Sequence, residues 1–391
     1  MRKGWEYKKL GEVLETTSGG TPSKSHKEYY EGGTIPWLRS GEVSKGDIYD
    51  AELYITEEGL KKSSAKLFPI DTVLIAMYGA TVGQVGILKS TMCTNQAICG
   101  ILPNKDFHPN FLKYVLLANK KNYLKQAIGG AQPNISQQVI KSTYIPIVKF
   151  SEQESVVSEL DKINELIRLK KEQLKDFDNL AQSLFYEMFG DPVENEKGWD
   201  LKKLDNVCNI TSSKRIFADE YTNTGIPFYR SKEVIERSKG LPISVELFIS
   251  EERYNEIKEK FGVPKIGDIL ITAVGTIGKI WAIDTDNKFY FKDGNLVWLK
   301  DIDNQLANSC FFRRLLEYLI EEYKKTNANG AAYNALTIAK LKLMSCPLPP
   351  LSLQRRFAQR IEQIEREKSE VQKSIQDLET LLASRMQYWF E

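Results

Sequence analysis

The spacing of hydrophobic positions is typical of long helices in two segments of the chain. Two segments of about forty residues, beginning near residues 151 and 351, have no glycine or proline in their interior and are rich in Leu, Ile, Lys, Glu and Gln. Their apolar side chains recur at alternating steps of three and four, the spacing of a helix that packs along one seam. The pattern predicts two long helices, over residues 150–190 and 351–391.

The two seams share one phase. Their apolar members are Leu160, Ile163, Ile167, Leu174, Phe177 and Leu184 in the first helix, and Ile361, Ile364, Val371, Ile375, Leu378 and Leu382 in the second. We expect the helices to pair as an antiparallel coiled coil with an approximate two-fold axis. At about 1.5 Å per residue, about thirty helical residues would measure roughly 45 Å. Packing of each helix on its own globular domain remains the alternative.

Outside these segments the chain shows short runs of β-branched and aromatic residues, as in 72–77, 269–273 and 288–299. Each globular part also contains one clear helical pattern, Asn110 to Ala127 and Cys310 to Lys325. Residues 1–149 and 199–350 are therefore predicted to be α+β domains. Residues 191–198 have no apolar period and are predicted to be a linker.

The two halves of the sequence are copies of each other. The segment from Gly4 to Val13 reappears as Gly198 to Val207, with six of ten positions identical. Further pairs of matching blocks are 35–43 with 226–234, 73–83 with 269–278, 130–134 with 330–334, and 153–189 with 354–390. The offset between copies drifts because the connecting loops differ in length. Different loops on one repeated frame indicate two sites of different specificity.

Composition narrows the function classes. The five cysteines are scattered without metal-site spacing, so reduced and mostly buried thiols are expected. With only two histidines, the chain has few residues for histidine-based acid–base catalysis or for a histidine metal site. The sequence shows neither a signal peptide nor a membrane-spanning segment, so no membrane association and a cytoplasmic location are expected. The net charge of +2 is small for a protein that grips DNA alone, unless a partner supplies phosphate contacts.

The order of globular domain, long helix, globular domain and long helix resembles the specificity subunits of type I restriction-modification systems. The resemblance rests on the Gly-Trp-x-x-x-Lys-Leu opening, the Ile-Pro-Trp/Phe-x-Arg-Ser block and the Gly-x-x-x-Asn turn, each present twice. It implies two target-recognition domains, 1–149 and 199–350, joined by the spacer helices. Each domain would read one half of a split, asymmetric site in double-stranded DNA.

The resemblance also implies partners. Two methyltransferase subunits, and possibly restriction subunits, would dock on the helices and adjacent segments. Adenine methylation with S-adenosylmethionine would belong to those partners, so this chain is expected to be non-catalytic and to hold no cofactor and no metal.

Four groups of residues are candidate DNA contacts. Arg39, Ser40, Arg230 and Ser231 recur in both copies, and Arg can read guanine or clamp a phosphate; the alternative is structural pairing with Glu42 or Glu233. Tyr78, Thr81, Gln84, Thr276 and Lys279 flank the glycine turns, which lack the spacing of a nucleotide-binding loop; a merely structural turn is the alternative. The remaining candidates are Gln132, Asn134, Tyr333 and Asn334 beside helix ends, and Ser23, Lys24, Lys214 and Arg215 in polar loops that differ between the copies.

Two other function classes compete with DNA reading. A coiled-coil adaptor that joins protein partners and binds no DNA fits the modest charge. A nuclease or methyltransferase would need motifs that are absent, since no Asn/Asp-Pro-Pro-aromatic tetrapeptide occurs. The divergent loops on a repeated frame favour the DNA reader.

Overall fold

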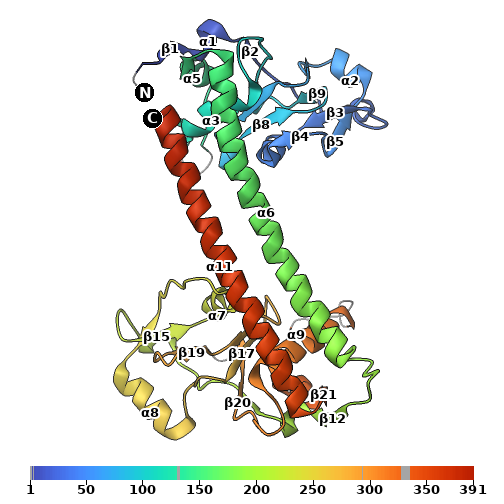
Figure 1. Cartoon of the computed structure of the whole chain (residues 1–391), viewed down its shortest axis with the longest axis vertical. Helices are drawn as coiled ribbons and strands as arrows, with labels where there is room; N and C mark the ends of the chain where they lie inside the picture. Colours follow the sequence, from blue (N-terminus) through green and yellow to red (C-terminus); the bar gives the residue numbers. More distant parts are fainter. Residues whose placement is uncertain (1, 3, 130–132, 293, 327–334) are drawn as a thin grey trace. The chain divides into compact units, whose positions relative to one another are not determined.

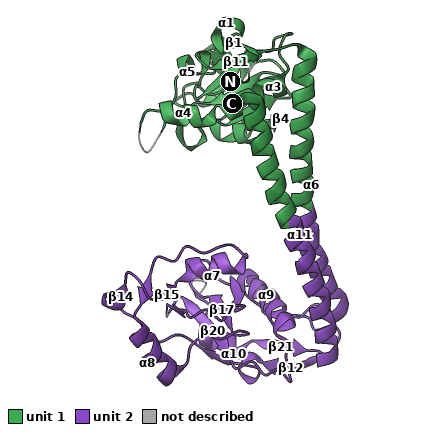
Figure 2. Ribbon diagram, turned by 60° about the vertical axis from the view of Figure 1, so that its left-hand side comes forward, with its two compact units in different colours: residues 1–172, 372–391 green, residues 173–371 purple. Residues whose placement is uncertain are grey.

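The computed structural model describes residues 2, 4–129, 133–292, 294–326 and 335–391. The chain forms two compact units, one from residues 1–172 and 372–391 and the other from 173–371 (Figure 2). The division falls within the long helices α6 (Phe150–Phe189) and α11 (Leu351–Phe390). Each unit is therefore a globular head together with half of each long helix.

Two sheets and a two-stranded ladder form the head of the first unit (Figure 1). The larger sheet has the order β2-β10-β7-β8-β4 and the smaller one the order β5-β3-β9-β6; β1 pairs with β11. Neighbouring strands are antiparallel except for the pairs β4/β8 and β3/β9. The strands are β1 (Glu6–Lys9), β2 (Thr16–Ser18), β3 (Ile35–Leu38), β4 (Asp47–Ile48), β5 (Leu53–Ile55), β6 (Leu67–Phe68), β7 (Val73–Ala76), β8 (Val85–Leu88), β9 (Met92–Thr94), β10 (Ile98–Ile101) and β11 (Tyr144–Ile147).

The head of the second unit repeats the central part of this topology. Its sheets have the orders β13-β20-β17-β18 and β14-β16-β15-β19, with β12 paired to β21 and a parallel pair, β15/β19, matching β3/β9. The strands are β12 (Asp200–Lys203), β13 (Asn209–Thr211), β14 (Tyr221–Thr222), β15 (Ile226–Tyr229), β16 (Phe248–Ile249), β17 (Ile269–Thr272), β18 (Ile280–Ala282), β19 (Tyr290–Phe291), β20 (Leu296–Lys300) and β21 (Ser345–Leu348). The sequence repeat is thus also a repeat of the central strand pairing, although β14 is added at one sheet edge and the described residues of this head form no strands equivalent to β4 and β6.

Central strand β7 is buried on both faces, which explains its uninterrupted apolar run. Alternate side chains point to opposite sides of a strand. Val73 and Ile75 join the core beneath the helices, whereas Leu74 and Ala76 join a smaller core with residues of the second sheet. In the other head Ile269 and Leu270 divide in the same way.

The helix expected from Asn110 to Ala127 is broken in two, so that prediction was too simple. The structure has α3 (Pro109–Ala118) and α4 (Lys120–Gln126), separated at Asn119. The Asn119 side chain donates to the carbonyl of Val115 at 2.9 Å, and such local bonds compete with helix propagation. Its repeat mate is continuous, α9 (Ser309–Thr326), as the sequence predicts.

Shorter helices connect these elements. In the first unit they are α1 (Leu10–Val13), α2 (Glu57–Lys61), α5 (Gln137–Lys141) and the 3₁₀ turns η1 (Lys27–Tyr29), η2 (Ser40–Lys45) and η3 (Gly79–Thr81). In the second unit they are α7 (Ser231–Ser238), α8 (Glu251–Phe261), α10 (Ile338–Leu343), η4 (Leu204–Asn206) and η5 (Ala218–Glu220).

Within each unit the two long helices run antiparallel. In the first unit Glu159 accepts hydrogen bonds from Arg385, and Lys171 pairs with Glu379 at 2.8 Å. In the second unit Phe185 packs on Phe357, with ring centroids 5.7 Å apart, and Lys368 bonds Asp178 at 2.7 Å. Every seam residue expected from the sequence is buried or half-buried. The predicted antiparallel coiled coil is confirmed.

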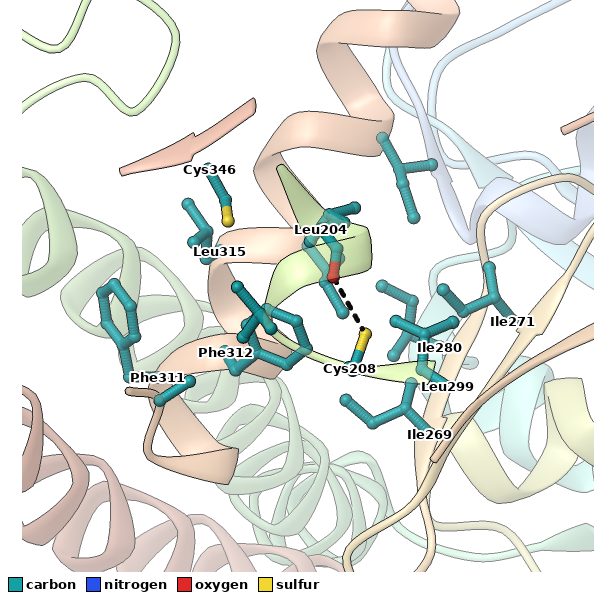
Figure 3. Packing of buried hydrophobic residues seen from close by; sticks show 14 of the residues in the cluster. Leu204, Cys208, Ile269, Ile271, Ile280, Leu299, Phe311, Phe312, Leu315 and Cys346 are labelled. Atoms are coloured by element: carbon teal, nitrogen blue, oxygen red, sulfur yellow. Dashed lines mark hydrogen bonds between the residues drawn. The ribbon is translucent and has the colours of Figure 1, made fainter. Parts of the chain in front are cut away.

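The alternative packing is also present, because each head is completed by both helices. In the second unit Phe185 and Phe189 of α6 and Phe357 and Ile361 of α11 join one core with the strands and α9. Figure 3 shows part of this core, with Phe311, Phe312 and Leu315 of α9 on one side of the view and Ile269, Ile271 and Leu299 of the sheet on the other. The two packing modes that the sequence left as alternatives therefore occur together.

A buried glutamine anchors the start of each long helix, at equivalent positions of the two copies. The Gln153 side chain accepts from the amide of His108 at 2.8 Å and donates to the carbonyls of Asp106 and Val148. Gln354 accepts from Asn308 at 2.8 Å and donates to Leu306 and Pro349. Both glutamines are fully buried. Each thus ties its helix to the loop that precedes the main helix of the head.

All five cysteines are free, and four of them are buried, as expected. Within the described ranges, no helix has the length and apolar character needed to cross a membrane.

Candidate nucleic-acid interface

The glycine turn after β7 brings three predicted contact residues of the first head together. Gly79 and Gly83 have positive φ angles of 70° and 75°, which glycine adopts without strain. The amide of Gly79 donates to Pro133 at 2.8 Å, and Tyr78 forms an isolated β-bridge with Asn134. Tyr78, Thr81 and Asn134 therefore lie in adjacent loops, whereas the side chain of Gln84 is half-buried beside them.

The second head has the same turn with a different surface. Gly275 and Gly278 again have positive φ angles, and the Thr272 hydroxyl accepts from the amide of Lys279 at 2.9 Å. Thr276 is exposed and Lys279 half-exposed. The candidates Gln132, Tyr333 and Asn334 lie outside the described residues.

Arg39 and Arg230 each bind two carboxylates. Arg39 contacts Glu52 at 2.5 Å and lies 4.0 Å from Glu42. Arg230 contacts Glu233 and Glu246, each at 2.8 Å. Structural pairing, one of the two interpretations open from the sequence, accounts for the recurrence of this arginine.

The buried glutamate partner explains the three-residue spacing between arginine and glutamate in this repeated motif. Glu42 and Glu233 are almost fully buried, and each accepts a hydrogen bond from the backbone amide of the arginine three residues earlier. A buried carboxylate needs such partners because its desolvation is costly. The Arg-Ser-x-Glu sequence therefore builds a capped helical turn after β3 and after β15. Ser40 and Ser231 begin these turns.

The outer carboxylate of this arrangement in the second head is strongly perturbed. Hydrogen bonds from Lys232 and then Arg230 lower the pKa of Glu246 to about 2. In the first head, Arg39 and Lys45 lower the pKa of Glu52 in the same way.

Lys24 and Arg39 meet at an open cavity of about 580 Å³ on the first head. The cavity lies between the loop that follows β2, the start of η2, and the loop between β9 and β10. Its other lining residues are Thr21, Lys27, Tyr30, Glu31, Trp37, Leu53, Asn95 and Gln96. Ser23 is exposed in the same loop and contacts Ser25.

The corresponding loop of the second head carries Lys214 and Arg215. Its backbone is fixed by an aromatic side chain, since the amide of Lys214 donates to the Tyr290 hydroxyl at 2.6 Å. Lys214 and Arg215 are exposed, and the Lys214 ammonium lies 4.9 Å from the centre of the Phe261 ring. The loops that differ most in sequence therefore also have different surroundings.

Asn95 and Gln96 were not among the candidates from the sequence. They follow a buried strand without a glycine or a basic residue beside them, so the loop has no compositional signal. Only the pairing of β3 with β9 shows that this loop borders the same cavity as Lys24. Alignment of the two copies would have shown the difference at these positions.

One protein family matches this chain twice. The family described as "Type I restriction modification DNA specificity domain" matches residues 2–176 and again residues 196–380. The two matches cover most of both halves.

Relatives and solved structures agree with this match. The chain is 28% identical to the type I restriction enzyme MjaIX specificity subunit of Methanocaldococcus jannaschii, over 91% of this chain and 85% of that protein. A structure described as showing complex assembly and conformational transition of the type I R-M system has a TM-score of 0.66 at 22% identity, with 100% of this chain and 98% of that chain covered. An S subunit from M. genitalium has a TM-score of 0.53 at 16% identity, with 99% and 96% covered. At these identities the structures establish the fold alone.

Proposed function

Because this chain belongs to the family of type I restriction modification DNA specificity domains, we propose that it reads the DNA target of a type I restriction-modification complex. Each head reads one half of a bipartite, asymmetric site in double-stranded DNA. The observation that carries the proposal is that two heads with the same central strand pairing present different loops. A shared frame with different contact loops is what two unlike half-sites require.

The chemistry belongs to partners in this proposal. Two methyltransferase subunits, and a restriction subunit where one is present, dock on the helices and the segments beside them. The methyltransferase subunits bind S-adenosylmethionine and methylate adenine. The chain itself supplies position and sequence readout, in keeping with the relatives' designation as specificity subunits.

The modest net charge fits a reader that shares phosphate contacts with its partners. Charge is also distributed unequally: residues 1–149 carry 19 Lys and Arg against 13 Asp and Glu, whereas residues 199–350 carry 22 against 20. The competing function, a protein adaptor that binds no DNA, gives no reason for divergent loops on both heads.

An electrophoretic shift experiment separates these two functions. The chain is mixed with genomic restriction fragments, with and without a methyltransferase subunit from the same host. We expect a shift of particular fragments once the methyltransferase is present, and methylated adenines within the bound fragments. No selective shift under either condition would overturn the proposal, and methylation by this chain alone would show that it is an enzyme.

A further inference from the structure

The cavity on the first head has a rigidly held wall. A Cβ atom at Gly19 would lie 2.1 Å from the Thr94 hydroxyl, and one at Gly20 would lie 2.2 Å from the carbonyl carbon of Ser64. Only glycine allows this close approach. The amide of Gly20 also donates to the carbonyl of Thr94 at 2.9 Å, so the loop after β2 lies directly against the loop that contains Gln96.

Two aromatic residues fix the same loop from the other side. The Trp37 indole donates to the carbonyl of Gly20 at 2.9 Å, and the Tyr30 hydroxyl donates to the carbonyl of Pro22 at 2.5 Å. The two rings pack edge to face, with centroids 6.1 Å apart. The cavity is therefore preformed, which lowers the entropy cost of binding.

Gln96 is held in this wall with its hydrogen-bonding groups incompletely used. Its carbonyl oxygen accepts from the Thr21 hydroxyl, which restrains the position of the amide oxygen. A carbonyl oxygen has a second lone pair and the amide nitrogen has two donors. The exposed Gln96 side chain thus presents one acceptor and one donor side by side. This is the complement of the major-groove edge of adenine.

Positive charge flanks this amide. Lys24 and Lys27 line the cavity, and neither has an ion-pair partner among the described residues. The charge of Arg39 is already paired with that of Glu52, which leaves Lys24 and Lys27 as the cations available to a ligand. Glu31 also lines the cavity, so the two lysines exceed the one carboxylate by a single positive charge. Ammonium groups beside an exposed amide are suited to the phosphates next to a base pair.

The equivalent loop of the second head is one residue longer. The amide of Met77 donates to Ala97, and in the other copy the amide of Ala273 donates to Asn295. The amides of Asn95 and Lys292 donate to the equivalent residues Leu38 and Tyr229, so the second copy has two residues, 293 and 294, where the first has Gln96 alone. The loop that carries Gln96 therefore differs in both length and sequence between the two copies.

We propose that Gln96 is a specificity-determining residue that reads the adenine of one A·T pair in the half-site of the first head. Thr21 acts as a positioning residue that orients the amide. This inference rests on the proposed function, and its test is chosen so that the two can fail separately.

The test measures discrimination at each base pair. The target is first defined by mapping methylated adenines with the unsubstituted complex; failure to find any target would refute the proposed function itself. Competition binding is then measured for the assembled complex against duplexes substituted at one base pair at a time. A bidentate contact corresponds to about 5- to 150-fold discrimination.

For Gln96→Ala we expect discrimination to be lost at one A·T pair in one half-site and retained at every other position. Thr21→Val should weaken discrimination at the same pair. Gln138→Ala, at an exposed glutamine of the same head outside the cavity, should leave the whole profile unchanged. Unchanged discrimination in Gln96→Ala, or a uniform loss of affinity for all duplexes, would overturn the inference while leaving the proposed function in place.

Discussion

Two glutamines in equivalent positions show what a single buried side chain contributes to this fold. Gln354→Leu would leave the Asn308 amide and the carbonyls of Leu306 and Pro349 without their side-chain partner. Each unsatisfied group costs about 1–3 kcal/mol. We expect the second unit to lose at least about 2 kcal/mol of unfolding free energy in urea, and hydrogen exchange at Asn308 to accelerate.

The matched control lies on the same helix. Gln363 is exposed and its side chain donates to Glu367 at 3.3 Å, so Gln363→Leu should change stability by less than about 0.5 kcal/mol. Equal losses in the two variants would mean that the Gln354 anchor contributes nothing specific.

The charged cluster around Arg230 gives a pH prediction. The pKa of Glu246 is lowered from 4.5 to about 2 by Lys232 and Arg230. A depressed folded-state pKa stabilises the fold above the unfolded value and loses that contribution as pH falls. The Glu246 contribution should therefore be complete above pH 4.5 and disappear towards pH 2.

Carboxyl chemical shifts in an NMR titration test this directly. Glu246 should titrate near pH 2, and Lys232→Met should move its midpoint upward while Glu246 remains paired to Arg230. A midpoint near 4.5 in the unsubstituted protein would contradict the observed ion pairs.

The sequence predicted the repeated framework better than it predicted the contacts between loops. The Arg39 and Arg230 motifs were visible because they recur, and the structure gives that recurrence a cause in the buried Glu42 and Glu233. Gln96 was invisible because its importance arises from Gly20 and Trp37, which lie far from it in sequence. Contacts between loops depend on strand pairing that local patterns do not encode.

At the scale of elements, the end of α11 is secured by a cluster of aromatic and charged side chains within the first unit. The Trp389 ring stacks on Trp5 with centroids 5.9 Å apart, and the Arg2 guanidinium lies 4.1 Å from its centre. The Trp389 indole also donates to Glu159 of α6 at 3.1 Å. The last turn of α11 thus joins the start of the chain to α6.

Removing this ring should detach the last turn. We expect Trp389→Ala to destabilise the first unit by roughly 2–4 kcal/mol, because a half-buried ring, a cation–π contact and a hydrogen bond are lost. Differential scanning calorimetry with hydrogen exchange would locate the loss in residues 1–172. Gln387→Ala, two residues away and exposed, serves as the control; destabilisation of residues 173–371 instead would contradict the prediction.

Helix patterns were the most reliable part of the sequence. The seams over α6 and α11 were predicted because period and phase are local properties. The break at Asn119 was missed because an asparagine within an apolar pattern gives no indication that its side chain will bond Val115. The sheets were foreseen only as strands, since their order depends on distant pairing.

At the scale of the whole molecule, DNA binding should depend on salt through a few uncompensated charges. Lys24 and Lys27 line the first head's cavity without ion-pair partners in the described part of the chain. Each phosphate contact contributes about −0.9 to the slope of log K against log salt. The double variant Lys24→Gln, Lys27→Gln should therefore reduce the slope by about 2, for specific and non-specific duplexes alike.

Fluorescence anisotropy of labelled duplexes, measured with the assembled complex over a range of salt, gives the slope. Lys61→Gln combined with Lys105→Gln removes the same charge elsewhere on the head and should leave the slope unchanged. A reduction of equal size in this control would mean that overall charge, and not the cavity, sets the salt dependence.

The composite build of the first unit has a consequence for synthesis. Its head ends before residue 150, yet the aromatic residues of α11 that complete its core come more than two hundred residues later. During synthesis the core of this head therefore stays incomplete, with Trp5 and neighbouring apolar surface uncovered, until nearly the whole chain has emerged from the ribosome. The head that is synthesised first completes its core last, and we expect chaperones to bind mainly to this head.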